Sequence, residues 1–439
     1  MSSTLAASRG THAGGAAQAG LRRGSSVLPV LPWSGSVLKQ PKQQQPQQRR
    51  TAAAALSGRR QRRAVRAVAA PLAPEVSASE HTVELHAAVE AVRLASRLCQ
   101  AVQVELKTGE KVEKEDESPV TVADYGAQAL VAWSLQHAFP GQPLSMVAEE
   151  DAIDLRTAEG AVMLARITAL VNEALAVEHP QVAPLTPGEV ADLVDSGSSQ
   201  GGGQGRHWVL DPIDGTRGFV GMRQYAVCLG LLQEGEVVLG VLGCPNLPQY
   251  AITADDCDEG QAARSFSDEA VGTMFAASKG QGAYAGPVFG GMPRQRIFCN
   301  DILAPGEARY MESFEARHSN HGLAMQIADE IGVELPSLRL DSQAKYGALS
   351  RGDASIFMRF PDASYREKIW DHCAGVAIIE EAGAVISDAL GNPLDFSQGR
   401  FFPDLNGGIV AATPSMHRAI MAAIRKIRGL PPREQQAEQ

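Results

Sequence analysis

Apolar residues recur with two different periods along the chain, which is typical of a protein built from both helices and strands. They recur every three or four residues over 81–104, 126–139 and 160–177, and this spacing predicts amphipathic helices. Shorter apolar runs bounded by turn residues predict strands. We expect strands at 143–147, 208–210, 225–232, 237–243, 296–299, 310–314, 337–341, 354–360, 385–387 and 408–412, and further helices at 318–331, 376–381 and 415–426.

Two stretches interrupt this pattern and predict irregular structure. Residues 180–205 contain several prolines and end in a Ser- and Gly-rich run, and residues 280–291 are punctuated by glycines. Both compositions are typical of loops and turns. We therefore expect a loop over the first stretch and turns over the second.

The stretch 208–219 combines a buried strand with a group of polar side chains. Three apolar residues lead into Asp211 and Asp214, which enclose a proline. Because proline fixes its own φ angle and lacks an N–H, the two carboxylates can turn towards one centre, and hard cations such as Mg²⁺ bind such oxygens. Gly215 and Thr216 would then begin a helix whose free N–H groups favour a phosphate. The alternative is a simple turn with Thr216 as a helix cap.

Three more acidic residues stand at the boundaries of predicted elements rather than on exposed helix faces. Asp124 lies where a helix is expected to begin, Glu149 follows a strand and Asp371 precedes a helix. If these carboxylates converge on the Asp211–Asp214 pair, they repel one another unless cations neutralise them. The sequence therefore predicts the acidic site of a two-metal phosphatase, provided that these elements meet at one point.

Charge divides the chain into a basic leader and an acidic body. The first 74 residues contain ten Arg, two Lys and no Asp or Glu, and removing these twelve charges from the net −10 leaves −22 on residues 75–439. A leader rich in Arg and Ser without an apolar core is typical of an organellar transit peptide. We expect import into the chloroplast, with the mitochondrion as the alternative. A disordered basic arm that binds nucleic acid is the other interpretation of the leader.

The chain shows neither a membrane segment nor a zinc motif. No window reaches the ~18 apolar residues of a membrane span, so we expect a soluble protein without a membrane or nucleic-acid partner. The six cysteines form no Cys-x-x-Cys pair and no Cys/His cluster with zinc spacing. A regulatory disulfide stays open at this point because pairing does not follow from spacing. The oligomeric state is also open, and a monomer is compatible with the sequence.

Three motifs occur in the order found in one enzyme family. Glu149-Glu150, Asp-Pro-Ile-Asp-Gly-Thr at 211–216 and Trp-Asp-His-x-Ala-Gly at 370–375 resemble the signatures of the inositol monophosphatase superfamily of Mg²⁺-dependent, lithium-sensitive phosphatases. Further blocks are similar to the plant-type 3'(2'),5'-bisphosphate nucleotidases of sulfur metabolism, at 118–128, 207–210 and 341–353. The resemblance runs from about residue 83 to residue 424.

The resemblance implies an α/β fold in which two domains stack as a layered αβαβα sandwich. Residues 1–74 would be a disordered transit peptide and 75–295 an N-terminal α+β domain that binds metal. Residues 296–430 would be a C-terminal α/β domain that binds substrate, and 431–439 a flexible tail. The metals would lie in the cleft between the two domains.

The resemblance also assigns a metal site. The carboxylates of Glu149, Asp211, Asp214 and Asp371 and the carbonyl oxygen of Ile213 would hold two or three Mg²⁺ ions. Asp211 would bridge two of them. Because all of these ligands are oxygen atoms, the set has the chemistry that Mg²⁺ requires.

The catalytic roles that the resemblance implies belong to Asp124 and Thr216. The Asp124 carboxylate would accept a hydrogen bond from the Thr216 hydroxyl, which would orient and help deprotonate the attacking water. The backbone N–H groups of Gly215 and Thr216 would bind the phosphate as negative charge develops on it. No covalent intermediate is implied.

The substrate contacts implied by the resemblance are Ser313, His318, Ser342, Lys345 and Arg351. Lys345 and Arg351 also have an electrostatic rationale, because a body with a net charge of −22 needs local cations to hold a polyanion. Each position has a purely structural interpretation as well, as a strand hydroxyl, a helix start or a solvated loop charge.

These assignments predict hydrolysis of the 3'-phosphate of adenosine 3',5'-bisphosphate, or of its 5'-phosphosulfate analogue, to AMP or adenosine 5'-phosphosulfate and phosphate. An inositol polyphosphate 1-phosphatase of the same fold is the alternative substrate class. A non-catalytic regulator that binds metal or nucleotide is an alternative of another class. The presence of Asp124, Thr216 and Asp371 argues against such a regulator, since a pure sensor does not need the pair that activates water.

Overall fold

The protein is described here from a computed structural model with side chains. The structure describes residues 80–108, 119–252, 271–313, 321–362 and 364–431. All of these belong to one compact unit. The predictions for the leader, for the tail and for His318 lie outside the described residues. Within the described ranges, no helix combines the length and the apolar character needed to cross a bilayer.

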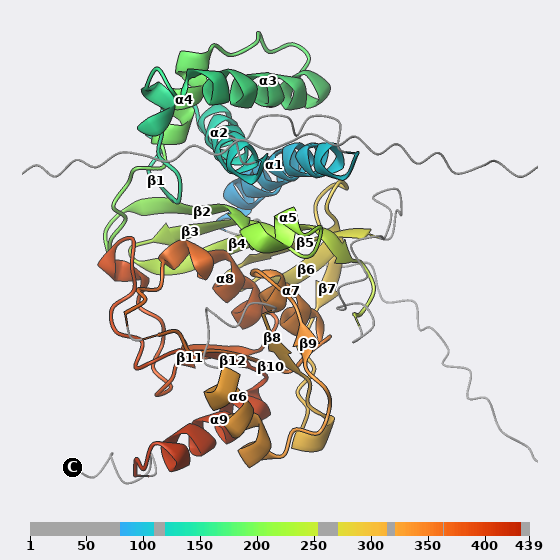
Figure 1. The fold of residues 1–439 in the computed structure, drawn as a ribbon. Helices are drawn as coiled ribbons and strands as arrows, with labels where there is room; N and C mark the ends of the chain where they lie inside the picture. Colours follow the sequence, from blue (N-terminus) through green and yellow to red (C-terminus); the bar gives the residue numbers. More distant parts are fainter. Residues whose placement is uncertain (1–79, 109–118, 253–270, 314–320, 363, 432–439) are drawn as a thin grey trace, which may run out of the picture. The chain divides into compact units, whose positions relative to one another are not determined.

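The described elements stack in five layers in the order helix, sheet, helix, sheet, helix (Figure 1). Helices α1 and α2 pack on the first sheet, α7 and α8 lie between the sheets, and α6 and α9 form the last layer. The predicted α/β sandwich is therefore confirmed. The helices are α1 Thr82–Thr108, α2 Pro119–Ala138, α3 Ala161–Glu178, α4 Pro187–Asp195, α5 Thr216–Val220, α6 His321–Ile331, α7 Ala344–Arg351, α8 Cys373–Glu381 and α9 Pro414–Ile427.

The first sheet is buried on both faces. Its strand order in the described residues is β1 to β7 without interruption, with β1 parallel to β2 and the other neighbours antiparallel. Along β2, Trp208 and Leu210 belong to the core beneath α1 and α2, and Val209 belongs to the core between the sheets. The strands are β1 Met146–Ala148, β2 Arg206–Asp214, β3 Ala226–Gln233, β4 Glu236–Pro248, β5 Val271–Ser278, β6 Gly282–Pro287 and β7 Gln295–Ile297.

The second sheet has the order β11-β12-β10-β8-β9 in the described residues. Its two faces also belong to different cores: Ile356 and Met358 of β10 pack with α6 and α9, and Phe357 packs in the core between the sheets. The strands are β8 Tyr310–Glu312, β9 Leu338–Arg339, β10 Ile356–Arg359, β11 Val385–Asp388 and β12 Ile409–Ala412.

Helix α8 lies unusually close to the first sheet. A Cβ atom on Gly240 would lie 2.2 Å from the carbonyl oxygen of Ala374, and one on Gly230 would lie 2.5 Å from the sulfur of Cys373. Because both strand positions lack a side chain, the first turn of α8 rests directly on β3 and β4. The 3₁₀ turn Ile369–Asp371, just before α8, is thereby placed against β2.

Helix α2 begins earlier than its apolar spacing predicts. Pro119 is its first residue, and proline is favoured there because the first N–H groups of a helix have no intrahelical partner. Asp124 therefore lies inside the helix, and the prediction that it marks the helix start is wrong.

Two regular segments occur where irregular structure was expected. Helix α4 lies within 180–205, and it begins with a capping box in which Thr186 accepts a hydrogen bond from the Glu189 N–H while the Glu189 carboxylate accepts one from the Thr186 N–H. Strand β6 lies within the Gly-rich stretch 280–291. It pairs with β5 and β7, so pairing between strands overrides the low strand preference of glycine.

The predicted domain boundary at residues 295 and 296 stays a prediction. The first sheet ends with β7 and the second begins with β8, so the two sheets follow one another in sequence. Helix α8, however, packs against strands of both sheets. The motif 370–375 begins in the turn before this helix and ends in its first residues.

The described cysteines form no disulfide with one another. They are Cys99, Cys228, Cys244, Cys299 and Cys373, and four of the five are buried. Burial raises the pKa of Cys228 well above its ordinary value, as it does for Cys99, and a protonated thiol is a poor nucleophile. The sixth cysteine, Cys257, lies outside the described residues.

Candidate active site

The end of β2 contains a register shift that positions two carboxylates. Asp211 lies opposite Cys228 of β3, and three residues later Asp214 lies opposite Ala226, only two residues away on β3. β2 therefore contains one residue more than its partner, which is a β-bulge. Pro212 lies inside this bulge, where its missing N–H removes no hydrogen bond from a regular ladder.

Asp211 is a buried acid with an unsatisfied oxygen. It is 3% exposed, and among the described residues its Oδ1 atom has no hydrogen-bond partner. Burial, together with the charges of Glu149 and Asp214, raises the pKa of Asp211 well above its ordinary value. Because a buried, unpaired carboxylate is costly, the unsatisfied oxygen points to a role as a cation ligand.

Further acids approach β2 from the helical side of the sheet. Glu149 follows β1, the parallel neighbour of β2, and Asp124 lies buried in α2. Burial and the charges of Glu150 and Glu149 raise the pKa of Asp124 well above its ordinary value. Burial and Glu149 also raise the pKa of Glu150 to about 7, against the lowering effect of a hydrogen bond with Tyr125. The negative charges of Asp124 and Glu150 are thus poorly compensated.

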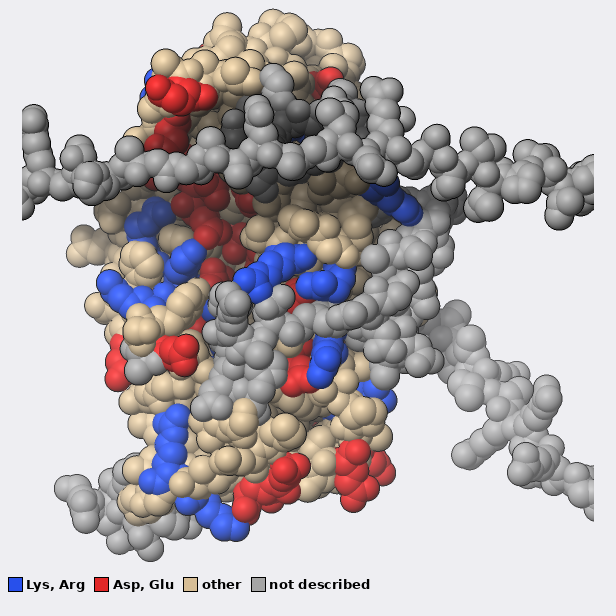
Figure 2. All heavy atoms as spheres, in the orientation of Figure 1, with Lys and Arg blue, Asp and Glu red and all other residues tan. Residues whose placement is uncertain are grey.

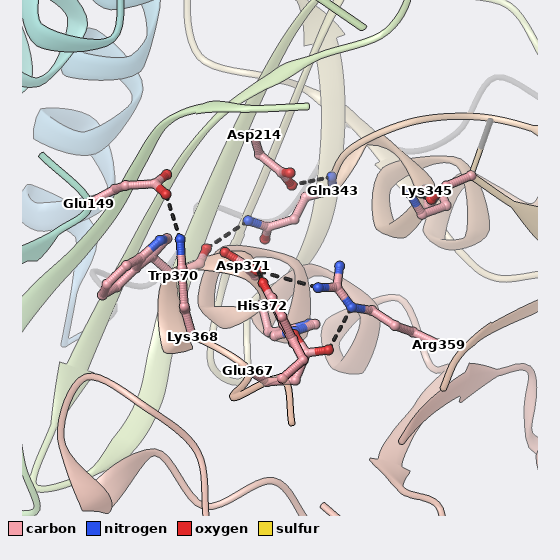
Figure 3. Close-up of polar contacts among 12 residues, drawn as sticks. Glu149, Asp214, Gln343, Lys345, Arg359, Glu367, Lys368, Trp370, Asp371 and His372 are labelled. Carbon is pink, nitrogen blue, oxygen red and sulfur yellow. Dashed lines mark hydrogen bonds and ion pairs between the residues drawn. The ribbon is translucent and has the colours of Figure 1, made fainter. Parts of the chain in front are cut away.

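Asp214 at the end of β2 and Asp371 in the turn before α8 lie in the same part of the site (Figure 3). The Asp214 carboxylate accepts the Gln343 N–H at 2.6 Å. Burial and the charge of Asp371 raise the pKa of Asp214 to about 6, although Lys345 lowers it. Asp371 lies 3.6 Å from Nη2 of Arg359, and burial nevertheless raises the pKa of its carboxyl.

These carboxylates fit a divalent cation that takes oxygen ligands. The donor atoms are all oxygens, the acids raise one another's pKa values, and one buried oxygen has no partner in the described part of the chain. Each of these observations indicates negative charge that the protein alone leaves uncompensated. The predicted ligands Glu149, Asp211, Asp214 and Asp371 are thereby brought to one region by β1, β2 and the turn before α8.

A second acidic group lies behind Asp371 and has partners of its own. Among the described residues, one ligand atom each of Glu367, Asp371 and His372 lie within 4.8 Å of one another. Glu367 accepts a hydrogen bond from Arg359 at 2.6 Å and lies 3.1 Å from Nε2 of His372, whose Nδ1 is 2.6 Å from the Tyr346 hydroxyl. Burial alone would raise the pKa of Glu367, but Arg359 and His372 lower it to about 2. We interpret this group as the support of Asp371.

Gly215 connects the bulge of β2 to α5. Its φ angle of 91° is in the left-handed region, and a Cβ atom there would lie 3.0 Å from the Cβ of Ser342. Only glycine fits this turn without strain. Thr216 is the first residue of α5, and α5 packs against α2, which carries Asp124. The elements that carry the predicted catalytic pair are therefore neighbours.

A cavity of 330 Å³ opens beside Gly215 and Thr216. Its lining includes the acids Asp214 and Asp371 and the cations Arg217, Lys345 and Arg359. Figure 2 shows acidic side chains in a hollow of the surface with Lys and Arg side chains beside them. A polyanion can thus meet cations of the protein next to the acidic cluster.

Lys345 is a buried cation at this cavity. It is 5% exposed, and its Nζ atom donates to Oγ of Ser313 at 3.1 Å and to the carbonyl oxygen of Leu340 at 3.0 Å. Burial lowers the pKa of Lys345 to about 8, although Asp341 and Asp214 raise it. Ser313 and Ser342 line the same cavity, so three of the predicted substrate contacts come together here.

Arg351 lies elsewhere. Its guanidinium pairs with Asp353 at 2.5 Å and donates to the carbonyl oxygen of Pro248 at 2.8 Å. It lines a separate cavity of 360 Å³ beside the Gly-rich segment 286–291. The structure therefore does not bring Arg351 to the other predicted substrate contacts, and His318 lies outside the described residues.

Two cations of the site were missed from the sequence. Arg359 ends the apolar strand β10 and lines the cavity with Lys345. Lys368 precedes the Trp370-Asp371 pair and binds Glu149 at 2.6 Å (Figure 3). Their positions in the sequence could have indicated them, since Arg359 ends an apolar run and Lys368 lies beside a motif.

Comparisons with known proteins agree with these motifs. Residues 80–428 match the family model described as the inositol monophosphatase family. A 3'(2'),5'-bisphosphate nucleotidase of Oryza sativa is 46% identical over 357 residues, which cover 80% of this chain and 97% of that protein. The 3'(2'),5'-bisphosphate nucleotidase 1 of Arabidopsis thaliana is 49% identical over 301 residues, which cover 68% of this chain and 84% of that protein.

A more distant relative and a solved structure extend the comparison. A 3'(2'),5'-bisphosphate nucleotidase of Emericella nidulans is 40% identical over 353 residues, covering 78% of this chain and 98% of that protein. The solved inositol monophosphatase of Anabaena superposes with a TM-score of 0.48 at 18% identity, covering 81% of this chain and 100% of that chain.

The family match spans most of the chain and includes all three ordered motifs, at 149–150, 211–216 and 370–375. The resemblance to 3'(2'),5'-bisphosphate nucleotidases is confirmed by relatives that are 40% to 49% identical and bear that name. The chain belongs to the inositol monophosphatase family.

Proposed function

We propose that the protein is a metal-dependent phosphatase that removes the 3'-phosphate of adenosine 3',5'-bisphosphate. One observation carries this proposal: a single cavity joins undercompensated carboxylates to the cations Lys345 and Arg359. The carboxylates suit a cation that binds the reacting phosphate, and the two basic residues suit a second anionic group of the same substrate. The names of the relatives from Oryza sativa and Arabidopsis thaliana support a bisphosphate nucleotide as that substrate.

The ligands of the proposed magnesium are Glu149, Asp211, Asp214, Asp371 and the carbonyl oxygen of Ile213. When bound, magnesium would supply Lewis-acid stabilisation of phosphoryl oxygens and would neutralise these acids. The unsatisfied oxygen of Asp211 and the raised pKa values of Asp211 and Asp214 support the assignment.

We assign the handling of the water proton to Asp124 and Thr216. The Thr216 hydroxyl donates to the Asp124 carboxylate and directs its own lone pair to a hydrogen of the attacking water, so the water oxygen points at phosphorus. The contact between α5 and α2 and the burial of Asp124 support this pairing. The N–H groups of Gly215 and Thr216 stabilise the charge that develops on the phosphate oxygens.

The second phosphate is held by Lys345 and Arg359. Arg359 is fixed by Glu367, so its guanidinium is already oriented before substrate arrives. Lys345 is held at Ser313 and the Leu340 carbonyl, at the same cavity. The volume of 330 Å³ is at the lower end of the range that small ligands occupy, which suits a mononucleotide.

The experiment is a comparison of phosphate release across substrates. The purified full chain with Mg²⁺ is given adenosine 3',5'-bisphosphate, its 5'-phosphosulfate analogue or inositol 1,4-bisphosphate at equal concentrations. We expect the adenosine bisphosphate to be hydrolysed fastest and a chelator to abolish the release. Faster release from inositol 1,4-bisphosphate would make the protein an inositol polyphosphate 1-phosphatase, and binding without any hydrolysis would make it a regulator.

A further inference from the structure

Lys368 makes a contact between two distant parts of the chain that both carry predicted metal ligands. Its Nζ atom lies 2.6 Å from Oε1 of Glu149, which is 219 positions away in the sequence (Figure 3). The two side chains are 31% and 32% exposed. The contact thus joins the segment after β1 to the turn that carries Asp371.

The position of Lys368 is fixed by its surroundings. Its Nζ atom lies 5.3 Å from the ring centroid of Trp370, and the guanidinium of Arg400 lies 4.7 Å from the same centroid. Arg400 also donates to the carbonyl oxygen of Ala148, the residue before Glu149. Because the same aromatic ring orders both cations, the contact of Lys368 with Glu149 is built into the fold.

The carboxylates of the acidic cluster differ in whether a positively charged side chain lies beside them. Glu149 has the ammonium group of Lys368, whereas Oδ1 of Asp211 has no partner among the described residues. Asp371 at the other side has Arg359 at 3.6 Å. Lys368 therefore pairs with one carboxylate of the proposed ligand set, Glu149, while Oδ1 of Asp211 in the same set has no such partner in the described part of the chain.

We propose that Lys368 is an internal counter-ion that holds Glu149 in the metal-free protein and is exchanged for the metal when the site fills. This inference rests on the proposed function, which supplies the metal. Lys368 stabilises the metal-free state because its charge offsets the repulsion between Glu149 and the neighbouring acids. It is therefore a competitor of the metal, and removing it tightens metal binding.

The test measures metal affinity without any substrate. Mn²⁺ is titrated into the full chain, and free Mn²⁺ is followed by electron paramagnetic resonance. Lys368→Met is expected to bind Mn²⁺ about two- to fivefold more tightly than the unchanged protein, the range expected for a partly exposed ion pair. Lys426→Met is the matched control, because Lys426 pairs with Glu330 at 2.5 Å, far from the acidic cluster. The Mn²⁺ affinity of this variant should equal that of the unchanged protein.

A double substitution shows whether the effect acts through Glu149. In a Glu149→Gln background the lysine has lost its partner, so Lys368→Met should no longer tighten Mn²⁺ binding. If Lys368→Met fails to fold, Lys368→Gln removes the charge with a polar side chain, and the same tightening is expected.

The outcomes separate this inference from the function on which it rests. Weaker or unchanged Mn²⁺ binding by Lys368→Met overturns the counter-ion role, since a lysine that supports the ligand would weaken binding when it is lost. Tightening that persists in the Glu149→Gln background overturns the exchange at Glu149. A complete lack of Mn²⁺ binding by the unchanged protein rejects the proposed metal site itself, and the exchange with it.

Discussion

At the scale of single residues, the site is defined by which acids have a partner and which do not. Among the described residues, Asp214 accepts a backbone N–H and Glu149 pairs with a lysine, while one oxygen of Asp211 stays unsatisfied. Asp124 is buried, and its burial and the charges of Glu150 and Glu149 raise its pKa. These differences in environment support the proposed division between metal ligands and a residue that exchanges protons.

Asp124→Asn should bind substrate with little change and lose nearly all turnover, because the amide no longer accepts the Thr216 hydroxyl proton. The measurements are kcat and the dissociation constant of adenosine 3',5'-bisphosphate. Asp192→Asn is the control, since Asp192 is an exposed acid that pairs with Arg156. More than about a tenth of the original rate in Asp124→Asn would remove this residue from the activation of water.

Replacing Arg359 or Arg351 by lysine tests which of the two cavities binds the substrate. Arg359→Lys should raise the KM for adenosine 3',5'-bisphosphate about tenfold, because the lysine lacks the planar donor pair that binds a phosphate. Arg351→Lys should lower stability with the KM unchanged, since Arg351 pairs with Asp353 and lines the other cavity. Steady-state kinetics checks both variants, and the reverse order of effects would restore Arg351 as the substrate contact.

At the scale of elements, the β-bulge of β2 and the turn at Gly215 together set where the motif points. The bulge adds one residue to the strand, and the left-handed turn then starts α5 beside α2. A change in either feature would shift the carboxylates relative to the N–H groups that we propose bind the phosphate.

Gly215→Ala should reduce both stability and turnover. The left-handed backbone costs about 1–2 kcal/mol with a side chain, and the new methyl group would lie 3.0 Å from Ser342. Gly141→Ala is the control, because Gly141 has a φ of 79° with nothing within 4 Å of an added Cβ. Urea denaturation and kcat should show a loss of stability in both variants but a loss of turnover only in Gly215→Ala.

The sequence predicts which types of residue make up the site better than it predicts the contacts between them. Asp211 and Asp214 are recognisable because two acids and a proline end an apolar strand, and helices with regular spacing such as α3 follow from periodicity. The pairing of Lys368 with Glu149 spans 219 positions, and no local pattern encodes it. The family resemblance points to Arg351, and no motif in the sequence points to Arg359. The structure nevertheless places Arg359, the last residue of β10, in the lining of the cavity.

At the scale of the whole molecule, the acidic cluster makes stability depend on pH. Burial raises the pKa of Asp214 to about 6 and that of Glu150 to about 7, above the values that these groups have in the unfolded chain. At pH values between the unfolded-state and the folded-state pKa values of these groups, the folded protein binds more protons than the unfolded chain. The free energy of unfolding therefore falls as pH rises through this window.

The metal-free protein should accordingly be more stable near about pH 5 than near about pH 8. Added Mg²⁺ should stabilise the protein most at the higher pH, because the carboxylates are then ionised and free to bind it. Urea denaturation at both pH values, with Mg²⁺ or with a chelator, checks this expectation. Stability that rises with pH under chelator would contradict the description of the cluster as uncompensated.

The basic leader belongs to the same scale, although it lies outside the described residues. We propose that residues 1–74 direct import into the chloroplast, because they carry twelve positive and no negative side chains. A fusion of residues 1–74 to a fluorescent reporter should accumulate in that organelle. A reporter that stays in the cytosol contradicts the proposal, and one found in mitochondria selects the alternative.

The close seating of α8 on β3 and β4 has a consequence for how this enzyme tolerates variation. Gly230 and Gly240 touch no part of the cavity, yet a methyl group at either would collide with the start of α8 and displace the turn that carries Asp371. In a saturation screen for activity, these two positions should therefore be as intolerant as the acids themselves. We therefore expect related sequences to keep glycine at positions 230 and 240, where the close contact with α8 leaves no room for a side chain.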